Sequence, residues 1–570
     1  MVKLPKVGKG KKAKTMSNED VVAKFLHEKK IAVDYQKRRH KYWQEIYELY
    51  RNIVRINRLT QRQGINMPLM KETIKTLHAK IGDEPYVDFK SKSGDANKEI
   101  LINSLFRQKM DYCSFNLLDK VDKKQELLYG RSHMGLTLHD GEITPDVVDI
   151  YDLLIDPTAK PTDIESARFV IRTNVVRPLN EVKHDKKYAK QARNSISATQ
   201  MASQTKDQIK ARTQRLQAIG VEDASKIEGY DKIVMLDEYF TNLWDGEKNE
   251  FVRYYCVIGD DNTLLRAEPM IDAFGVEFYP YEGWASDLEA SDYWSDGVGD
   301  LILTPNKTIN IWISQHMENR TLRSFGMNFY DATIDGFTPQ TYNPRPGGWY
   351  PVPGSPKDVM QRVDVPELSG SLNDIQFVVN FAEKASATGA ITKGAVEDVK
   401  RTLGEIEIAV ANANQITNSS EDYYNTSRKR LMEKWYAMLE ANADTVKLYK
   451  KNTDGVYKSK DAKPEDYIDD EGYIIEVANT ASITNEKTNE LQNLYGFKQS
   501  FLPNNKTLDK LIQRRYASFL NLDPQEIQEI QDEEEQNAEQ ALQGQIQGIQ
   551  QPQAQSPQQL ATQVIPPGNQ

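Results

Sequence analysis

The 570-residue chain has only two cysteines, Cys113 and Cys256, which lie far apart in the sequence. So few thiols exclude a disulfide framework and a cysteine-rich metal site, and we expect both cysteines to be buried and reduced, as in a cytosolic protein. No apolar run reaches the ~20 residues that a membrane-spanning helix needs, so no membrane partner is expected. Six lysines lie among the first 14 residues without an apolar segment after them, and we therefore expect no secretory signal.

The sequence also lacks the short motifs of common catalytic sites. It has no Walker A loop, no HExxH helix, no CxxC pair and no G-x-S-x-G turn. Its seven histidines are dispersed, and only His133 and His139, beside Asp140, come near to a cluster. Because no third ligand is in view, we interpret these as structural residues. The prediction is a protein that is not an enzyme and holds neither a cofactor nor a metal.

One acidic run could in principle hold a divalent cation. Its spacing fits no EF-hand loop, and carboxylates just before a helix are favoured by the helix dipole alone. We prefer that second interpretation, with Gly297 and Gly299 letting the chain turn into the helix. The run consists of Asp287, Glu289, Asp292, Asp296 and Asp300.

The net charge of −10 argues against a protein that grips nucleic acid over its whole surface, but not against one past which DNA can slide. At this length we expect ~3–4 structural units. The first 19 residues are interpreted as a basic disordered tail. The last 30 residues contain 11 glutamines and no charge, which is typical of disorder.

The N-terminal half of the chain predicts a mixed α+β body. Helical patterning at 18–80 and 98–129 flanks a short strand that begins at Asp83. From Ile233 onward, alternating apolar residues and polar turns predict a β-meander. We expect the segment FGVEFYPYEGW, from Phe274, to close that sheet.

Residues 295–440 predict a helix that leaves the body, an irregular segment, and a long helix that returns. The first helix is expected over 304–325, with Thr304 as its cap and Pro305 in its first turn. Between Gly336 and Pro356 there are six prolines and four glycines, which neither a helix nor a central strand accommodates.

Helical patterning resumes after Leu372, pauses at SATGAITKG, and continues from Ala395 to about Asp444. A helix of ~50 residues would be ~75 Å long, so it crosses between layers, bends, packs on copies of itself or is interrupted by a loop. YIDDEGYIIEVAN, from Tyr467, is expected to add an edge strand to the body. An Asn/Ser-rich middle interrupts the apolar stripe of the long helix, which comprises Val396, Val399, Leu403, Ile406, Val410, Tyr424, Leu431, Trp435 and Met438.

In this order, the segments resemble the portal proteins of tailed bacteriophages from about Tyr42 to Leu520. VDIYDLLIDPTAKPTDIESARFVIRTNVV is similar to the portal stretch in which a strand, a D-P turn and an acidic helix lead to the next strand. GVEFYPYEGW followed by GVGDLILTPNKTINIWISQHMENRTLR resembles the last body strand and the first stem helix. ASATGAITKGAVEDVKRTLGEIEIAVANA is similar to the tunnel loop and the start of the long helix.

The resemblance implies a mostly helical portal-like fold with a wing β-sheet, a helical stem, a Pro/Gly-rich clip, a long wing helix and a helical crown. Its parts would be the wing at 20–294, stem helix 1 at 295–326, the clip at 327–370, stem helix 2 at 371–384, the tunnel loop at 385–394, the long helix and wing return at 395–483, the crown at 484–530 and an acidic, then Gln-rich, disordered tail at 531–570.

The resemblance also implies a function and partners. The chain would form a ring, dodecameric in this family, at one vertex of the virion capsid, after assembly in the host cytoplasm. Double-stranded DNA would pass through it during packaging and ejection, and it would contact the terminase large subunit, head–tail connector or adaptor proteins, and major capsid and scaffolding proteins. The candidate residues facing DNA are Lys393, Lys400 and Arg401, and those for docking at the clip are Pro344, Arg345, Trp349 and Tyr350.

Two alternatives remain open at this point. Another ring or adaptor protein of the head–tail junction would share the virion setting, although such proteins are usually shorter and lack the helix–clip–helix order. A metal-dependent nuclease would use the carboxylates between Asp287 and Asp300.

Overall fold

A computed structural model describes residues 16–53, 65–81, 85–139, 141–199, 232–245, 249–325, 327–330, 360–363, 371–386, 403–451, 457–479 and 492–498, with a few single positions besides. The chain divides into two units, Met1–Thr480 and Ala481–Gln570. Of the described residues, 51% are helical and 25% lie in strands, which confirms the predicted α+β class. None of the described helices is long and apolar enough to cross a membrane.

Helix α1 (Asn18–Tyr50) joins the two hydrophobic cores of the first unit. It begins with a capping box: the Asp20 N–H donates to Ser17 Oγ, and the Ser17 N–H donates to the Asp20 carboxylate. Near its start, Phe25 packs edge-on against Tyr239 in the smaller core. Further along, Trp43 and Ile46 are fully buried in the larger core.

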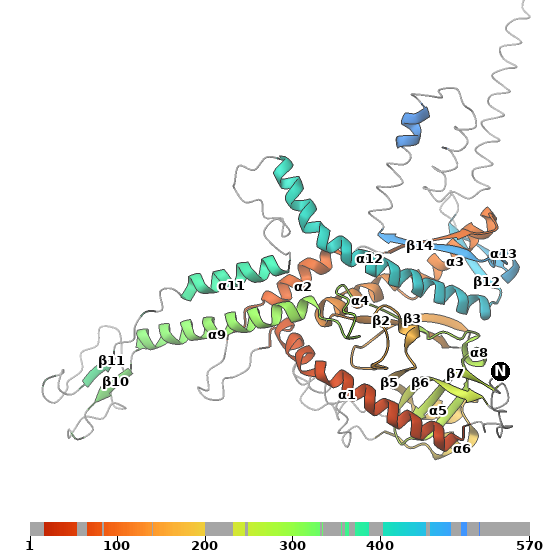
Figure 1. Cartoon of the computed structure of the whole chain (residues 1–570), viewed down its shortest axis with the longest axis horizontal. Coiled ribbons are helices and arrows are strands. Elements are labelled where there is room, and N and C mark those ends of the chain that lie inside the picture. Colours follow the sequence, from red (N-terminus) through yellow and green to blue (C-terminus); the bar gives the residue numbers. More distant parts are fainter. Residues whose placement is uncertain are drawn as a thin grey trace, which may run out of the picture. The chain divides into compact units, whose positions relative to one another are not determined.

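The smaller core lies on a five-stranded antiparallel sheet with the order β4-β5-β6-β7-β8 (Figure 1). The meander predicted from Ile233 is present as its last three strands. The strands are β4 (Leu153–Ile155), β5 (Phe169–Pro178), β6 (Ile233–Asp245), β7 (Glu250–Gly259) and β8 (Leu264–Pro269). Four short helices lie between them or follow them: η1 (Ile164–Ser166), α5 (Leu179–His184), α6 (Lys190–Ser195) and α8 (Met270–Phe274).

A three-stranded sheet corrects one prediction from the sequence. FGVEFYPYEGW does form a strand, β9 (Tyr281–Trp284), but β9 pairs with β2 (Ser132–His139) and not with the meander. The order is β3-β2-β9, with β3 at Glu142–Val148. Alternation of apolar residues specifies a strand but not the edge that it joins. Here Gly135 of β2 leaves room for the Tyr281 ring, which would lie 2.7 Å from a Cβ atom at that position.

Three helices, one pair of strands from distant parts of the sequence, and one hairpin complete the described part of the body. The helices are α2 (Leu69–Lys80), α3 (Ala96–Tyr112) and α4 (Phe115–Tyr129). The strand expected after Tyr467 is β14 (Tyr473–Asn479), which pairs antiparallel with β1 (Pro85–Ser91). A hairpin that we did not predict, β12 (Val446–Lys451) with β13 (Tyr457–Ala462), precedes the short helix α13 (Pro464–Tyr467). Of the two free cysteines, Cys256 is buried but Cys113 is only half-buried.

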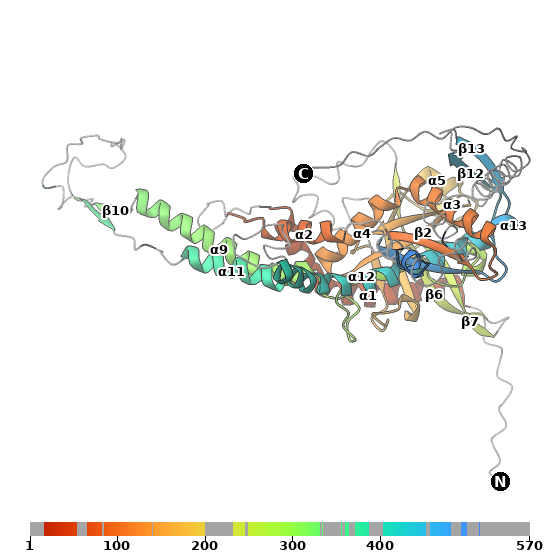
Figure 2. The same cartoon turned by 90° about the horizontal axis from the view of Figure 1, so that it is seen from above.

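Helices α9 (Val298–Phe325), α11 (Ser371–Ala385) and α12 (Leu403–Ala441) carry the chain out of this body and back (Figures 1 and 2). Helix α9 begins six residues before the predicted Thr304, so Pro305 lies inside it. The Gly297 N–H donates to the Asp300 carboxylate (3.0 Å), and this contact stabilises a first turn ahead of the proline. Pro305 therefore costs α9 the hydrogen bond to the Leu301 carbonyl without ending the helix.

We expect Gly130→Ala to destabilise the first unit far more than Gly141→Ala. Both glycines have positive φ, +83° and +85°, so each substitution carries the left-handed penalty of ~1 kcal/mol. Only at Gly130, which ends α4, would the Cβ lie 2.2 Å from a backbone atom, the Ser295 carbonyl oxygen; at Gly141 nothing lies within 4 Å. Thermal unfolding of both variants measures the difference, and equal losses would show that α4 does not approach Ser295 so closely.

Candidate functional site

The candidate site is built on the α9–α11 pair, two helices that run in opposite directions side by side in both views (Figures 1 and 2). Ile375, Val379 and Ala382 of α11 are buried, at the four- and three-residue spacing of one helix face. Beyond the pair, strands β10 (Met327–Tyr330) and β11 (Met360–Val363) form an antiparallel ribbon. The ribbon brings the two ends of the Pro/Gly-rich segment together.

The opposite side of α11 carries apolar side chains that nothing in the described chain covers. Phe377 and Phe381, one turn apart, are 71% and 59% exposed. On α9, Ile311 and Met317 are exposed as well. Monomeric soluble proteins rarely leave large apolar side chains exposed in groups, so this surface is suited to contact with another chain.

The start of the α9–α11 pair is fixed to the body by amide side chains. Asn306 Oδ1 accepts the Met70 N–H (2.8 Å), and Asn306 Nδ2 donates to the Met67 carbonyl (3.1 Å). One turn further on, Asn310 Oδ1 accepts the Met67 N–H (2.8 Å). The first turn of α2 has no side-chain cap of its own, so Asn306 satisfies an N–H group that the helix start would leave unpaired. These contacts hold α9 at a defined position against α2.

Helix α12 is held in the body by a fully buried group of charges, the Arg428 cluster, formed by Arg428, Tyr424, Asp119, Asp122 and Lys123. Arg428 Nε donates to Asp119 (2.9 Å), and its Nη2 atom donates to Asp122. Lys123 binds Asp119 at 2.8 Å, and the Tyr424 hydroxyl donates to the same carboxylate at 2.6 Å. The cluster joins α12 to α4 across about 300 positions of sequence.

The Arg428 cluster is electrically neutral, with two carboxylates and two cations. Burial alone would raise the pKa of Asp119, but Arg428 and Lys123 outweigh it and hold that pKa below its ordinary value. Burial likewise would lower the pKa of Arg428, but Asp122, Tyr424 and Asp119 raise it. Asp119 and Arg428 therefore both stay charged, and burial together with Asp119 raises the pKa of the Tyr424 hydroxyl, which stays protonated, so the cluster acts as a fixed link and not as a proton carrier.

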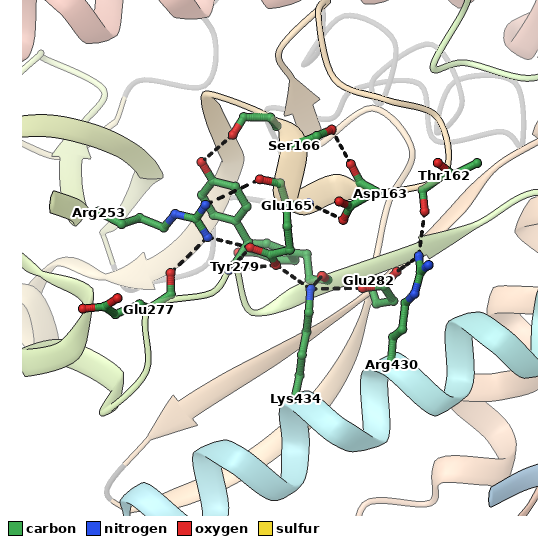
Figure 3. Close-up of polar contacts among 12 residues, drawn as sticks. Thr162, Asp163, Glu165, Ser166, Arg253, Glu277, Tyr279, Glu282, Arg430 and Lys434 are labelled. Carbon is green, nitrogen blue, oxygen red and sulfur yellow. Dashed lines mark hydrogen bonds and ion pairs between the residues drawn. The ribbon is translucent and has the colours of Figure 1, made fainter. Parts of the chain in front are cut away.

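A second group of charges, the Lys434 cluster, lies on the next turns of α12 and is shown in Figure 3. Lys434 Nζ contacts Glu165 (2.7 Å) and Glu282 (3.0 Å) and donates to the Tyr281 carbonyl (2.6 Å). Arg253 pairs with the other oxygen of Glu165 (2.5 Å), and Arg430 donates to a loop carbonyl next to η1. The cluster therefore ties α12 to η1, β7 and β9 at once.

Glu126 of α4 is a buried carboxyl group that forms no ion pair with any described residue. Its Oε1 atom accepts the backbone N–H and the hydroxyl of Ser286 (2.8 and 2.5 Å), whereas Oε2 has no hydrogen-bond partner among the described residues. Burial raises its pKa to about 7, although the two Ser286 hydrogen bonds act in the opposite direction. Near neutral pH this carboxyl group is therefore partly protonated.

The acidic run before α9 is held by α1 and does not converge on one point. Arg39 binds Asp296 (2.6 Å) and Asp300 (2.7 Å), while Asp292 accepts the Tyr35 hydroxyl (2.6 Å). Among the described residues no group of three or more His, Cys, Asp or Glu side chains could hold a metal. In this arrangement Asp296 and Asp300 pair with Arg39, which the sequence did not predict, and Asp300 also accepts the Gly297 N–H at the start of α9.

His133 and His139 lie at opposite ends of β2 and do not form a site together. His133 is fully buried, stacks on the Tyr293 ring and contacts its hydroxyl group (3.0 Å). Burial, and the charge of Arg131 after it, lower the pKa of His133 well below its ordinary value. His133 is therefore a neutral core residue.

The candidate residues that the resemblance implies lie outside the described residues. They are Lys393, Lys400 and Arg401 for contact with DNA, and Pro344, Arg345, Trp349 and Tyr350 for docking.

The sequence analysis missed the Arg428 cluster, although one sequence pattern indicates it. Between Tyr424 and Leu431 on the apolar stripe, Arg428 occupies the same helix face, and a charge on a buried face requires a buried partner.

The chain matches no protein-family model, and no curated protein matches its sequence significantly.

We expect Arg428→Met to destabilise the first unit by about 3–5 kcal/mol, because it leaves Asp119 and Asp122 buried with a single cation between them. Arg430→Met is the matched control. Arg430 is 44% exposed and lies 3.8 Å from Glu282, so its loss should cost at most ~1 kcal/mol. Denaturant unfolding followed by tryptophan fluorescence compares the two variants. Similar losses would contradict the assignment of the cluster as the main link of α12.

We expect Glu126 to make the stability of the first unit depend on pH. Its folded pKa of about 7 exceeds the ordinary value of 4.5, so the folded state binds a proton that the unfolded state releases between these values. The contribution of Glu126 to the free energy of unfolding is fully present below pH 4.5 and is lost as the pH rises to 7. At 1.36 kcal/mol per pKa unit, the loss amounts to about 3 kcal/mol. Glu126→Gln should remove that loss and raise the unfolding midpoint at pH 8 relative to the unsubstituted protein. Parallel pH profiles of the two proteins would refute this.

Proposed function

We propose that the chain is the portal protein of a tailed bacteriophage, a structural subunit that is not an enzyme. Copies of it form a closed ring at one capsid vertex, and double-stranded DNA passes through the ring during packaging and ejection. The terminase motor supplies the energy and docks at the Pro/Gly-rich segment, where head–tail connector proteins later bind. Capsid and scaffolding proteins surround the ring in the virion.

The order and pairing of three helices carry this proposal. Helix α9 leaves an α+β body, the ribbon β10–β11 closes a Pro/Gly-rich segment, α11 returns along α9, and the long α12 leads back into the body. This order corresponds to the stem, clip, stem and long wing helix of the family that the sequence resembles. An adaptor protein has no need of such a helix pair.

The exposed side chains of α11 support an assembly of several copies. Phe377 and Phe381 form a stripe that an isolated chain leaves in water, and a ring requires two different surfaces of each subunit to meet repeatedly until the ring closes. Rigid attachment of α9 and α12 to the body suits a ring that must keep its shape while DNA moves through it. The attachments are Asn306 on α2 and the Arg428 cluster on α4.

We expect negative-stain images of the purified protein to show rings with a central hole as wide as DNA. The variant Phe377→Asp with Phe381→Asp should abolish them, because two carboxylates per subunit cannot be buried unpaired between copies. The control variant Phe377→Leu with Phe381→Leu keeps the apolar contact and should keep the ring. Light scattering measures the mass of each species. A compact monomer at every concentration of the unsubstituted protein would refute the portal assignment.

A further inference from the structure

A short part of the chain carries a net positive charge, opposite in sign to that of the whole protein. The protein carries a net charge of −10, yet residues 177–193 contain six Lys or Arg against two Asp or Glu, a local formal charge of +4. This stretch forms α5 and α6, which pack on β5, β6 and β8 of the five-stranded sheet. It belongs neither to the α9–α11 pair nor to the Arg428 and Lys434 clusters. The portal proposal leaves it without a role.

The turn between α5 and α6 is held in one conformation. The Ala189 N–H donates to the Leu265 carbonyl of β8 (2.9 Å), which ties the turn to the sheet. Asp185 organises the rest: its Oδ1 atom accepts the Lys187 N–H (2.8 Å), and its carbonyl accepts Arg193 Nη1 (2.9 Å). The backbone of the turn is therefore fixed, and its lysines are presented from a defined position.

Four lysines of this stretch, Lys183, Lys186, Lys187 and Lys190, form what we call the lysine surface. Lys186, Lys187 and Lys190 are exposed and Lys183 is half-exposed. The neighbouring Arg177 pairs with Glu181 (3.2 Å), but none of the four lysines has a carboxylate partner among the described residues. The described part of the chain therefore does not neutralise their charge.

The chemistry of the lysine surface favours the phosphates of a duplex over other polyanions. Lysine binds phosphate as a point charge and reads no base sequence, so the contacts would be with the backbone. No large apolar side chain between 177 and 199 is exposed, which disfavours a protein partner, since protein interfaces use buried aromatic anchors. Single strands are bound on exposed aromatic rings, whereas Tyr188 is half-buried and burial raises its pKa to about 12.

We propose that the lysine surface on α5 and α6 binds the phosphate backbone of double-stranded nucleic acid without sequence preference. The surface belongs to α5 and α6, which pack on the five-stranded sheet, and not to α9, α11 or α12. The inference goes beyond the portal function and does not depend on it, because a single subunit carries the whole surface. If the chain does form a ring, the surface gives it a second DNA contact besides the passage through the centre.

The test uses a covalently closed duplex minicircle, which has no end to thread through a ring, and the full-length protein. Binding is measured by filter retention over a range of salt concentrations. We expect the Gln variant of Lys183, Lys186, Lys187 and Lys190 to bind at least tenfold more weakly near 0.1 M salt. The slope of log affinity against log salt should fall by about 3–4, because each lost phosphate contact releases about 0.9 fewer counterions.

A matched variant controls for net charge by replacing four dispersed exposed lysines with Gln: Lys30, Lys41, Lys75 and Lys429. It should keep its affinity within about twofold. If the fourfold variant fails to fold, single Lys→Gln variants should each lower the slope by about 1. The proposal is overturned if the control variant loses as much affinity, if the lysine variants bind the minicircle unchanged, or if polyglutamate or single-stranded DNA displaces it more effectively than linear duplex.

Discussion

The buried contact of Arg428 with Asp119 and Asp122 is the interaction on which the rest of the first unit depends. It sets the position of α12 against α4. Helix α4 in turn orients β2, because Gln125 Nε2 of α4 donates a hydrogen bond to the Ser132 hydroxyl of β2 (2.9 Å). Charges in a core are costly to bury, and a hydrophobic group of the same shape would often serve stability as well. The ion pairs instead fix the position of α12. A guanidinium group binds two carboxylates only at one rotation of the helix about its axis and one position along that axis.

The two ends of the excursion are fixed by different chemistry. Helix α9 is fastened by the neutral amides of Asn306 at the start of α2 and by ion pairs of Asp300 and Lys307 to α1, whereas α12 is fastened by buried ions on α4, η1, β7 and β9. Between these anchors, α11 touches α9 along a narrow apolar seam and keeps its phenylalanines on the outside. A rigid body with an apolar outer stripe fits a subunit whose neighbours complete it. The lysine surface adds a charged contact on a separate part of the same body.

Periodicity predicted most helices and strands of this fold, because the apolar positions recur at the intervals of one buried face. It predicted the meander from Ile233 and the strand in YIDDEGYIIEVAN, but it could not choose a partner for β9, since pairing depends on Gly135 admitting the Tyr281 ring. It placed the start of α9 at Thr304, because Pro305 suits a first turn, whereas the contact of Gly297 with Asp300 starts the helix earlier. Polar anchors such as Arg428 and Asn306 were missed because their partners lie hundreds of positions away.

The pairing of β1 with β14 has a consequence for how the protein is made. Strand β1 ends at Ser91 and its partner begins at Tyr473, so a ribosome adding roughly 5–20 residues per second leaves β1 without its partner for tens of seconds. An unpaired strand of this kind exposes backbone N–H and C=O groups, which can pair with a strand of another chain. Asn103 of α3 already blocks one side, since its amide donates to and accepts from the backbone of Phe89 (3.0 Å each). The edge that waits for β14 lies on the opposite side of the strand, so it stays open until the far end of the unit emerges.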